Sequence, residues 1–164
     1  MAIQTSLRAP HREQEQRPLG GYAGLTGLFA ALSIGFTAWL RRSGRRLPDR
    51  IAAEDLALIT VATHKLARLI AKDRVTSVVR APFTELQGDG GPGEVDEAAR
   101  GRGLGRAIGE LLVCPYCLDM WAAAGFSAGL AVAPRGTRWA ASTLTVLSGA
   151  DVLQIAYKKL EQIV

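Results

Sequence analysis

Two cysteines carry the most chemically suggestive string in the sequence, Cys-Pro-Tyr-Cys, which runs from Cys114 to Cys117. A CxxC pair at the N-terminus of a helix can hold a low-pKa thiolate, because the helix dipole stabilises negative charge there. Thiol–disulfide oxidoreductases place this motif after a strand in a βαβ pattern, whereas apolar helical sequence lies on both sides of it here. The surroundings argue against that enzyme class and leave the redox-responsive interpretation as one of three.

Metal binding is the second interpretation of the cysteine pair. Two thiolates at this spacing supply half of a tetrahedral zinc site. His64 is the candidate third ligand and Asp73 or Asp119 a fourth, unless two chains pool four thiolates. Zinc is thus the one cofactor that the sequence suggests, and no catalytic or cofactor-binding residue is assigned. In the third interpretation Cys114 and Cys117 are small, reduced packing residues where a helix enters from the cytosol.

Charged side chains form a second candidate site. His64, Lys65 and Arg68 lie in one segment, whereas Asp119 and Asp151 are isolated acids within apolar runs. Acids in such runs are costly and are normally paired or face water. We therefore predict intramembrane ion pairing among these residues, with Arg68 and Asp151 as the coupled pair. A structural ion pair explains them more simply than a proton or ion pathway, which needs several such groups in line.

Apolar segments must position these residues. Of the 164 residues 48% are apolar and the mean hydropathy is +0.12, which argues against an ordinary soluble enzyme. Residues 20–40 form an uncharged run that an arginine cluster follows at once, which is a stop-transfer pattern rather than a signal peptide. Residues 111–133 and 139–157 each contain one charge and also read as transmembrane helices. Residues 51–71 predict an amphipathic helix, either spanning or lying at the interface.

The fold class expected is therefore all-α, an integral membrane helical bundle of three transmembrane helices and a fourth helix packed against them. We expect a flexible tail at 1–19, then the first transmembrane helix and its arginine-rich flank at 20–50, and a membrane domain at 51–164. Within that domain residues 87–100 are expected to form a flexible loop, because residues 87–97 combine four glycines, a proline and four acids.

Basic residues indicate the orientation in the membrane. Lys and Arg are retained on the cytoplasmic side, and we compared a three-span topology with an outside N-terminus against a four-span topology with an inside N-terminus. Both place most of the 20 Lys and Arg residues inside. The number of basic residues placed inside differs too little between the two topologies to decide between them. Both nevertheless put the loop 72–110 and the C-terminus of a multi-pass protein in the cytosol.

Two sequence blocks carry a resemblance to a known family. The string THKLARLIAKDRVTSVVRAPFTE at 63–85 and the string GRGLGRAIGELLVCPYCLDMWAA at 101–123 together resemble an uncharacterised bacterial family of small integral membrane proteins, domain of unknown function thirteen-sixty. The resemblance covers about residues 55–157. It implies an integral membrane helical domain without an established activity, some of whose bacillar members are labelled sporulation proteins. The positions that match the family's motif are His64, Lys65, Arg68, Asp73, Arg80, Pro82, Glu110, Cys114, Cys117 and Trp121.

The function expected from the sequence is non-enzymatic. The first hypothesis is a membrane scaffold or accessory subunit that binds a protein partner or self-associates in the lipid bilayer of the bacterial cytoplasmic membrane. The second is a metal-binding or redox-responsive membrane module that uses Cys114 and Cys117. The third is a small transporter or channel component that uses Asp119 and Asp151. No nucleic-acid partner or small-molecule substrate is indicated, because a stop-transfer flank already explains the arginine cluster.

Overall fold

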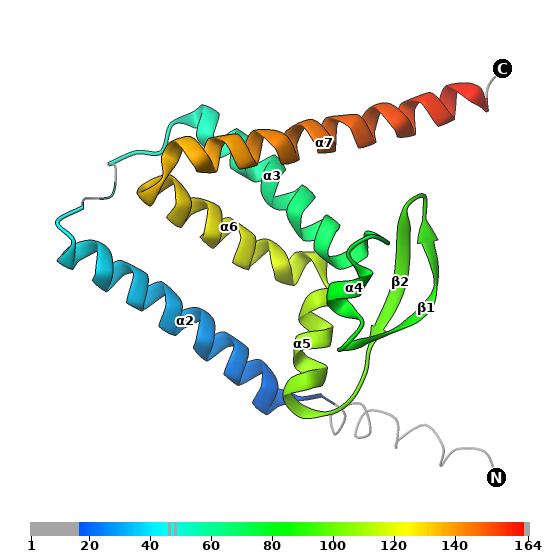
Figure 1. Ribbon diagram of the computed structural model, residues 1–164, viewed down its shortest axis with the longest axis horizontal. Coiled ribbons are helices and arrows are strands. Elements are labelled where there is room, and N and C mark those ends of the chain that lie inside the picture. The colour runs from blue at the N-terminus through cyan, green and yellow to red at the C-terminus, as the bar shows by residue number, and fades with distance from the viewer. Residues whose placement is uncertain (1–16, 46, 48, 163–164) are drawn as a thin grey trace, which may run out of the picture.

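The computed structural model describes residues 17–45, 47 and 49–162. Residues 1–16 of the expected N-terminal tail and Arg46 of the arginine cluster lie outside this part of the chain. The described part is mostly helical, with six helices and one two-stranded sheet (Figure 1). The elements are α2 (Leu19–Arg42), α3 (Ala53–Lys72), α4 (Ser77–Arg80), β1 (Thr84–Gly91), β2 (Glu94–Ala99), α5 (Gly103–Val113), α6 (Pro115–Val132) and α7 (Pro134–Glu161).

Helix α3 lies at the centre of the helical packing, between α6 and α7. Ile59 and Ala62 of α3 form a buried cluster with Phe126 of α6 and Ala141 of α7. A second cluster, nearer the C-terminus of α3, joins Ala67 and Ala71 to Leu118. The small alanine side chains let the helices approach closely. Because the order of contacts reverses between α3 and α6, these two helices run antiparallel.

The predicted helix at 111–133 is broken at Cys114, which corrects the expectation of one continuous span. Helix α5 ends at Val113, α6 begins at Pro115, and their axes are bent by 83°. Pro115 has no N–H to donate and disfavours a helical conformation in the residue before it. Cys114 accordingly has an extended backbone, with φ −105° and ψ 101°.

Only α2, among the described helices, is long and apolar enough to cross a membrane by itself. Helices α5 and α6 meet that requirement together, but they are the strongly bent pair. The predicted span 139–157 lies within α7, where Asp151 and Gln154 lower the mean hydropathy. The expectation of three confident transmembrane helices is therefore not supported, and one clear apolar span remains.

The predicted flexible loop is instead a β-hairpin. Strands β1 and β2 pair antiparallel, from Thr84 opposite Ala99 to Gly91 opposite Glu94. Gly91 and Gly93 have φ values of +129° and +79°, which residues with a side chain rarely adopt, so these glycines shape the turn. The glycine-rich composition therefore marks a tight turn between two paired strands.

Candidate functional site

The basic side chains of α3 fasten the hairpin to the helices. Arg68 donates to Glu94, with Nη2 and Oε1 2.5 Å apart, and Lys72 donates to Asp96, with Nζ and Oδ1 3.1 Å apart. Residues four apart on a helix and two apart on a strand each share a face, so the two pairs form in register. The acids that suggested a solvated tether are thus held by cations of α3.

Arg80, at the end of α4, is the centre of the most enclosed polar cluster. Its side chain is fully buried and that of Glu97 is 3% exposed, and Arg80 Nε lies 2.8 Å from Glu97 Oε2. The guanidinium also donates to the backbone carbonyls of Ile70 and Asp73 and to the hydroxyl of Thr76. One side chain therefore joins the C-terminal end of α3, α4 and strand β2.

Glu97 is equally well satisfied on its own side. Its carboxylate accepts hydrogen bonds from Ser77 Oγ at 2.5 Å and Thr84 Oγ1 at 2.8 Å in addition to Arg80. Burial by itself would raise the pKa of Glu97, but the hydrogen bonds from Arg80, Ser77 and Thr84 outweigh it and hold the pKa below its ordinary value. The hairpin is therefore docked through an ionised carboxylate.

Hairpin docking is expected to weaken in acid. Because the pKa of Glu97 is lower in the folded chain than in the unfolded chain, its stabilisation is fully present above the ordinary value of 4.5 and is lost as the pH falls through the lowered value. We expect the hairpin of the purified protein to become sensitive to limited proteolysis by an acid-stable protease as the pH falls below the ordinary value of 4.5. Glu85→Gln, at an exposed position of β1, should leave the profile unchanged, and a hairpin equally protected at pH 3 and pH 7 would contradict the prediction.

Asp151 pairs with Lys65, which corrects the predicted Arg68–Asp151 pair. Lys65 Nζ lies 2.5 Å from Asp151 Oδ2, whereas Arg68 one turn further along α3 is taken by Glu94. Helix α7 diverges from α3 beyond this point (Figure 1), so a residue closer to the middle of α3 meets Asp151. The structure therefore pairs this acid with Lys65, another member of the predicted charged cluster, instead of with Arg68.

Asp119 is not part of an ion pair within the described residues, although pairing was predicted for it. Its Oδ1 atom is buried without a hydrogen-bond partner there. Asp119 and His64 both line a groove of about 480 Å³ between α3 and α6. The groove is lined by Leu56, Ile59, Thr60, Thr63, His64, Asp119, Met120 and Ala123. His64 and Asp119 are thus brought to one groove, apart from the cationic residues of α3 that bind the hairpin.

The two cysteines meet at the break between α5 and α6. Both are free thiols, and Cys117 Sγ lies 2.6 Å from Cys114 Sγ. Cys114 occupies the N-cap of α6, where its sulfur accepts the backbone N–H of Cys117 at 3.3 Å. No group of three or more His, Cys, Asp and Glu side chains that could hold a metal ion is present in the described residues. His64 is therefore not brought to Cys114 and Cys117 to complete a zinc site within one chain.

Two further polar contacts between distant segments were not predicted. Arg138 at the start of α7 forms a two-pronged pair with Asp55 at the start of α3, with N···O distances of 2.7 and 2.8 Å. Tyr22 of α2 donates to Glu110 of α5. Asp55 and Arg138 are separated by 83 positions, so local spacing gives no signal for their pairing. Of these four residues, only Glu110 was singled out from the sequence, because it is among the residues that match the family motif.

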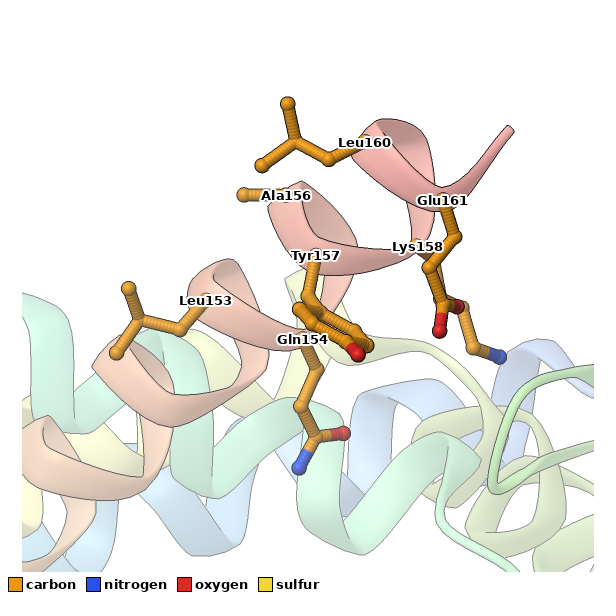
Figure 2. A pocket seen from close by; sticks show the side chains of 7 residues that line it. All are labelled: Leu153, Gln154, Ala156, Tyr157, Lys158, Leu160 and Glu161. Atoms are coloured by element: carbon orange, nitrogen blue, oxygen red, sulfur yellow. The ribbon is translucent and has the colours of Figure 1, made fainter. Parts of the chain in front are cut away.

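The C-terminal half of α7 projects beyond the other helices (Figure 1). Figure 2 shows its last turns, where a groove of about 640 Å³ lies against Leu153, Gln154, Ala156, Tyr157, Lys158, Leu160 and Glu161. Large apolar side chains recur every seventh residue along the helix, at Trp139, Val146, Leu153 and Leu160, and each is at least 63% exposed. We call these four residues the α7 seam. Ala141 and Leu144, which pack on the α3 cluster, lie on the opposite side of the helix.

Comparison with known proteins gives a family and one curated relative. A family model described as "Protein of unknown function (DUF1360)" matches residues 58–157. A curated protein of Bacillus subtilis (strain 168), named "Sporulation protein YjcA", is 28% identical over 107 residues, which are 63% of this chain and 91% of that protein. No solved structure matches. The matched region contains the Arg80–Glu97 cluster, the CxxC pair and most of α7.

Proposed function

This chain belongs to the DUF1360 family of proteins of unknown function, and we propose that it is a non-enzymatic membrane scaffold that assembles with a second copy of itself through α7. The observation that carries the proposal is the α7 seam, a heptad-spaced row of large apolar side chains with no partner among the described residues.

Helix α2 supports a location in the membrane. It has 24 residues, and Leu28 and Leu32 on one side of it and Ile34 on another are at least half exposed. Exposure of apolar side chains around a helix is what a lipid environment stabilises. Helix α6 runs parallel to α2, because Phe29 packs edge-on against Trp121 and further along Arg45 donates to the carbonyl of Val132. A bilayer crossed by α2 would therefore also enclose α6.

The directions of the long helices support the orientation. Helices α3 and α7 run parallel to each other, since Asp55 pairs with Arg138 and Lys65 with Asp151. Both run opposite to α6, and hence opposite to α2. This alternation brings the hairpin and the C-terminus to the same end of the bundle. We propose that this end faces the cytosol, because it carries the larger share of the Lys and Arg residues.

A second copy of the chain fits the seam better than lipid alone does. A repeat of seven residues keeps the four apolar side chains on one side of the helix over several turns, and such a row supplies one of the two apolar positions per heptad along which two helices pack. Lipid contact requires apolar character but no such period. The seam spans Trp139 to Leu160 and faces away from α3, so two chains can meet there without opening either helical bundle.

Cross-linking between chains tests this assembly. In a chain whose two natural cysteines are replaced by serine, Leu153→Cys should form covalent dimers in native membranes with a short bis-maleimide reagent, because two seams would bring the same position of both copies together. Val152→Cys is the matched control, since Val152 is as exposed as Leu153, at 64% against 72%, but lies off the seam.

The outcome must depend on the position. The proposal would be supported if Leu153→Cys forms dimers whose yield is unchanged when the membranes are diluted with added lipid, while Val152→Cys stays monomeric. Equal cross-linking at both positions would indicate random collision, and no cross-linking at either would indicate that lipid covers the seam. Either of these results would contradict assembly through α7.

A further inference from the structure

The break between α5 and α6 does more than interrupt a helix, because it brings the two thiols together. In an uninterrupted helix the Cβ atoms of residues three apart lie about 5 to 6 Å apart, which is further than the roughly 3.5 to 4.5 Å that a disulfide spans. Here Cys114 stands outside α6 as its N-cap, and the two Sγ atoms lie 2.6 Å apart. The chain is thus arranged at this point for contact between the sulfurs.

The pair is anchored but accessible. Leu118, directly after Cys117, is buried against Ala67 and Ala71 of α3, which fixes the first turn of α6. Cys117 is exposed and Cys114 half-buried, and the intervening Tyr116 is 86% exposed. A reagent can therefore reach the thiols while the backbone that carries them stays in place.

We propose that Cys114 and Cys117 are a dithiol that exchanges with low-molecular-weight thiol disulfides and closes to an intramolecular disulfide. This site reacts once per chain and goes beyond the scaffold role. A metal site would require further ligands beside the two sulfurs, and the described residues place no third one there. The geometry also assigns an order to the two residues. Cys114 is the attacking thiol, because its sulfur accepts both the backbone N–H and the thiol of Cys117.

The exchange balances in two steps. The Cys114 thiolate attacks one sulfur of the disulfide RSSR, a bond forms between Cys114 and RS, and the other RS leaves as thiolate. The Cys117 sulfur then attacks Cys114 Sγ, the Cys114–Cys117 bond forms, and the second RS leaves. The two protons of the cysteine thiols end on the two released thiols. Two electrons pass from the cysteine pair to RSSR, which is reduced to two RSH.

Thiol counting on the full chain in mild detergent tests the proposal. The protein is equilibrated with mixtures of reduced glutathione and glutathione disulfide and then alkylated with a maleimide carrying a polyethylene glycol chain. We expect both thiols to be lost together as the mixture becomes more oxidising, without covalent dimers. We expect Cys117→Ser to trap glutathione on Cys114 about tenfold faster than Cys114→Ser traps it on Cys117, because only the Cys114 sulfur accepts a backbone N–H, that of residue 117, which the serine variant retains.

Three results would overturn the assignment. In the first, the two thiols are lost independently or the disulfide links two chains. In the second, the two single variants trap glutathione at the same rate, so that neither thiol is activated. In the third, both thiols resist alkylation in reduced protein until a zinc chelator is added, which would make the pair a metal site. These readouts measure thiol chemistry and need no activity assay. A variant can therefore be compared as long as its circular dichroism shows that it is still helical.

Discussion

Replacing Arg80 by methionine is expected to lower the free energy of unfolding by about 3 to 5 kcal/mol, the usual cost of breaking a buried ion pair by removing one partner. The loss is large because Glu97 would stay buried and charged, and because the carbonyls of Ile70 and Asp73 would lose their donor. Thermal unfolding in mild detergent measures the loss, and limited proteolysis should show that the hairpin is released first.

Arg74→Met is the matched control for this experiment. Arg74 is also paired with a hairpin acid, Asp89, at 2.6 Å, but the side chains are 59% and 81% exposed. Exposed pairs contribute about 0 to 1 kcal/mol, so this variant should unfold close to the unmodified protein. The double change Arg80→Met with Glu97→Leu should regain part of the stability, since no orphan charge remains. Similar stability of the Arg80 and Arg74 variants would show that the enclosed cluster does not hold the hairpin.

Gly109→Ala is expected to destabilise the protein by about 1 to 3 kcal/mol, although alanine favours a helix. A Cβ atom at this position of α5 would lie 2.5 Å from the carbonyl oxygen of Phe83 and 2.9 Å from the Cβ of Ala99. The first neighbour is backbone and cannot rotate away. The hairpin would therefore have to move off α5, which the same thermal unfolding and proteolysis experiments detect.

Gly105, one turn earlier in α5, supplies the control. A Cβ atom there meets no other atom within 4 Å. Gly105→Ala should therefore raise stability, by up to about 1 kcal/mol, because alanine loses less backbone freedom than glycine when a helix forms. If the two alanine variants changed stability in the same direction and by the same amount, close contact between α5 and the hairpin would not explain the glycine at position 109.

Local patterns in the sequence were sufficient to find the helices. The uncharged run at 20–40 became α2 (Leu19–Arg42) and the amphipathic run at 51–71 became α3 (Ala53–Lys72), because hydrophobic period and charge flanks act over a few turns. The same patterns failed at Cys114, where one proline outweighed an apolar context that favoured a continuous helix.

The hairpin and the pairing of charges could not be found in this way. The acids of residues 87–97 contributed to the expectation of a flexible loop because their partners, Arg68, Lys72 and Arg80, lie in other elements. Composition counts charges but does not show which of them neutralise each other after folding. For the same reason the sequence favoured Arg68 as the partner of Asp151, whereas the divergence of α7 from α3 brings Lys65 to this acid instead.

Helix α7 is joined to α3 by two ion pairs, at Arg138 and at Asp151, and the rest of the helix extends to Glu161. The ten residues beyond Asp151 make an arm of about 15 Å. A force applied at Leu160 would therefore act as a torque about the Lys65–Asp151 contact, which is the ion pair of α7 nearest to Leu160 among the described residues. Because Lys65 precedes Arg68 by about one turn of α3, the contact that anchors the arm lies next to the helix end that holds the hairpin.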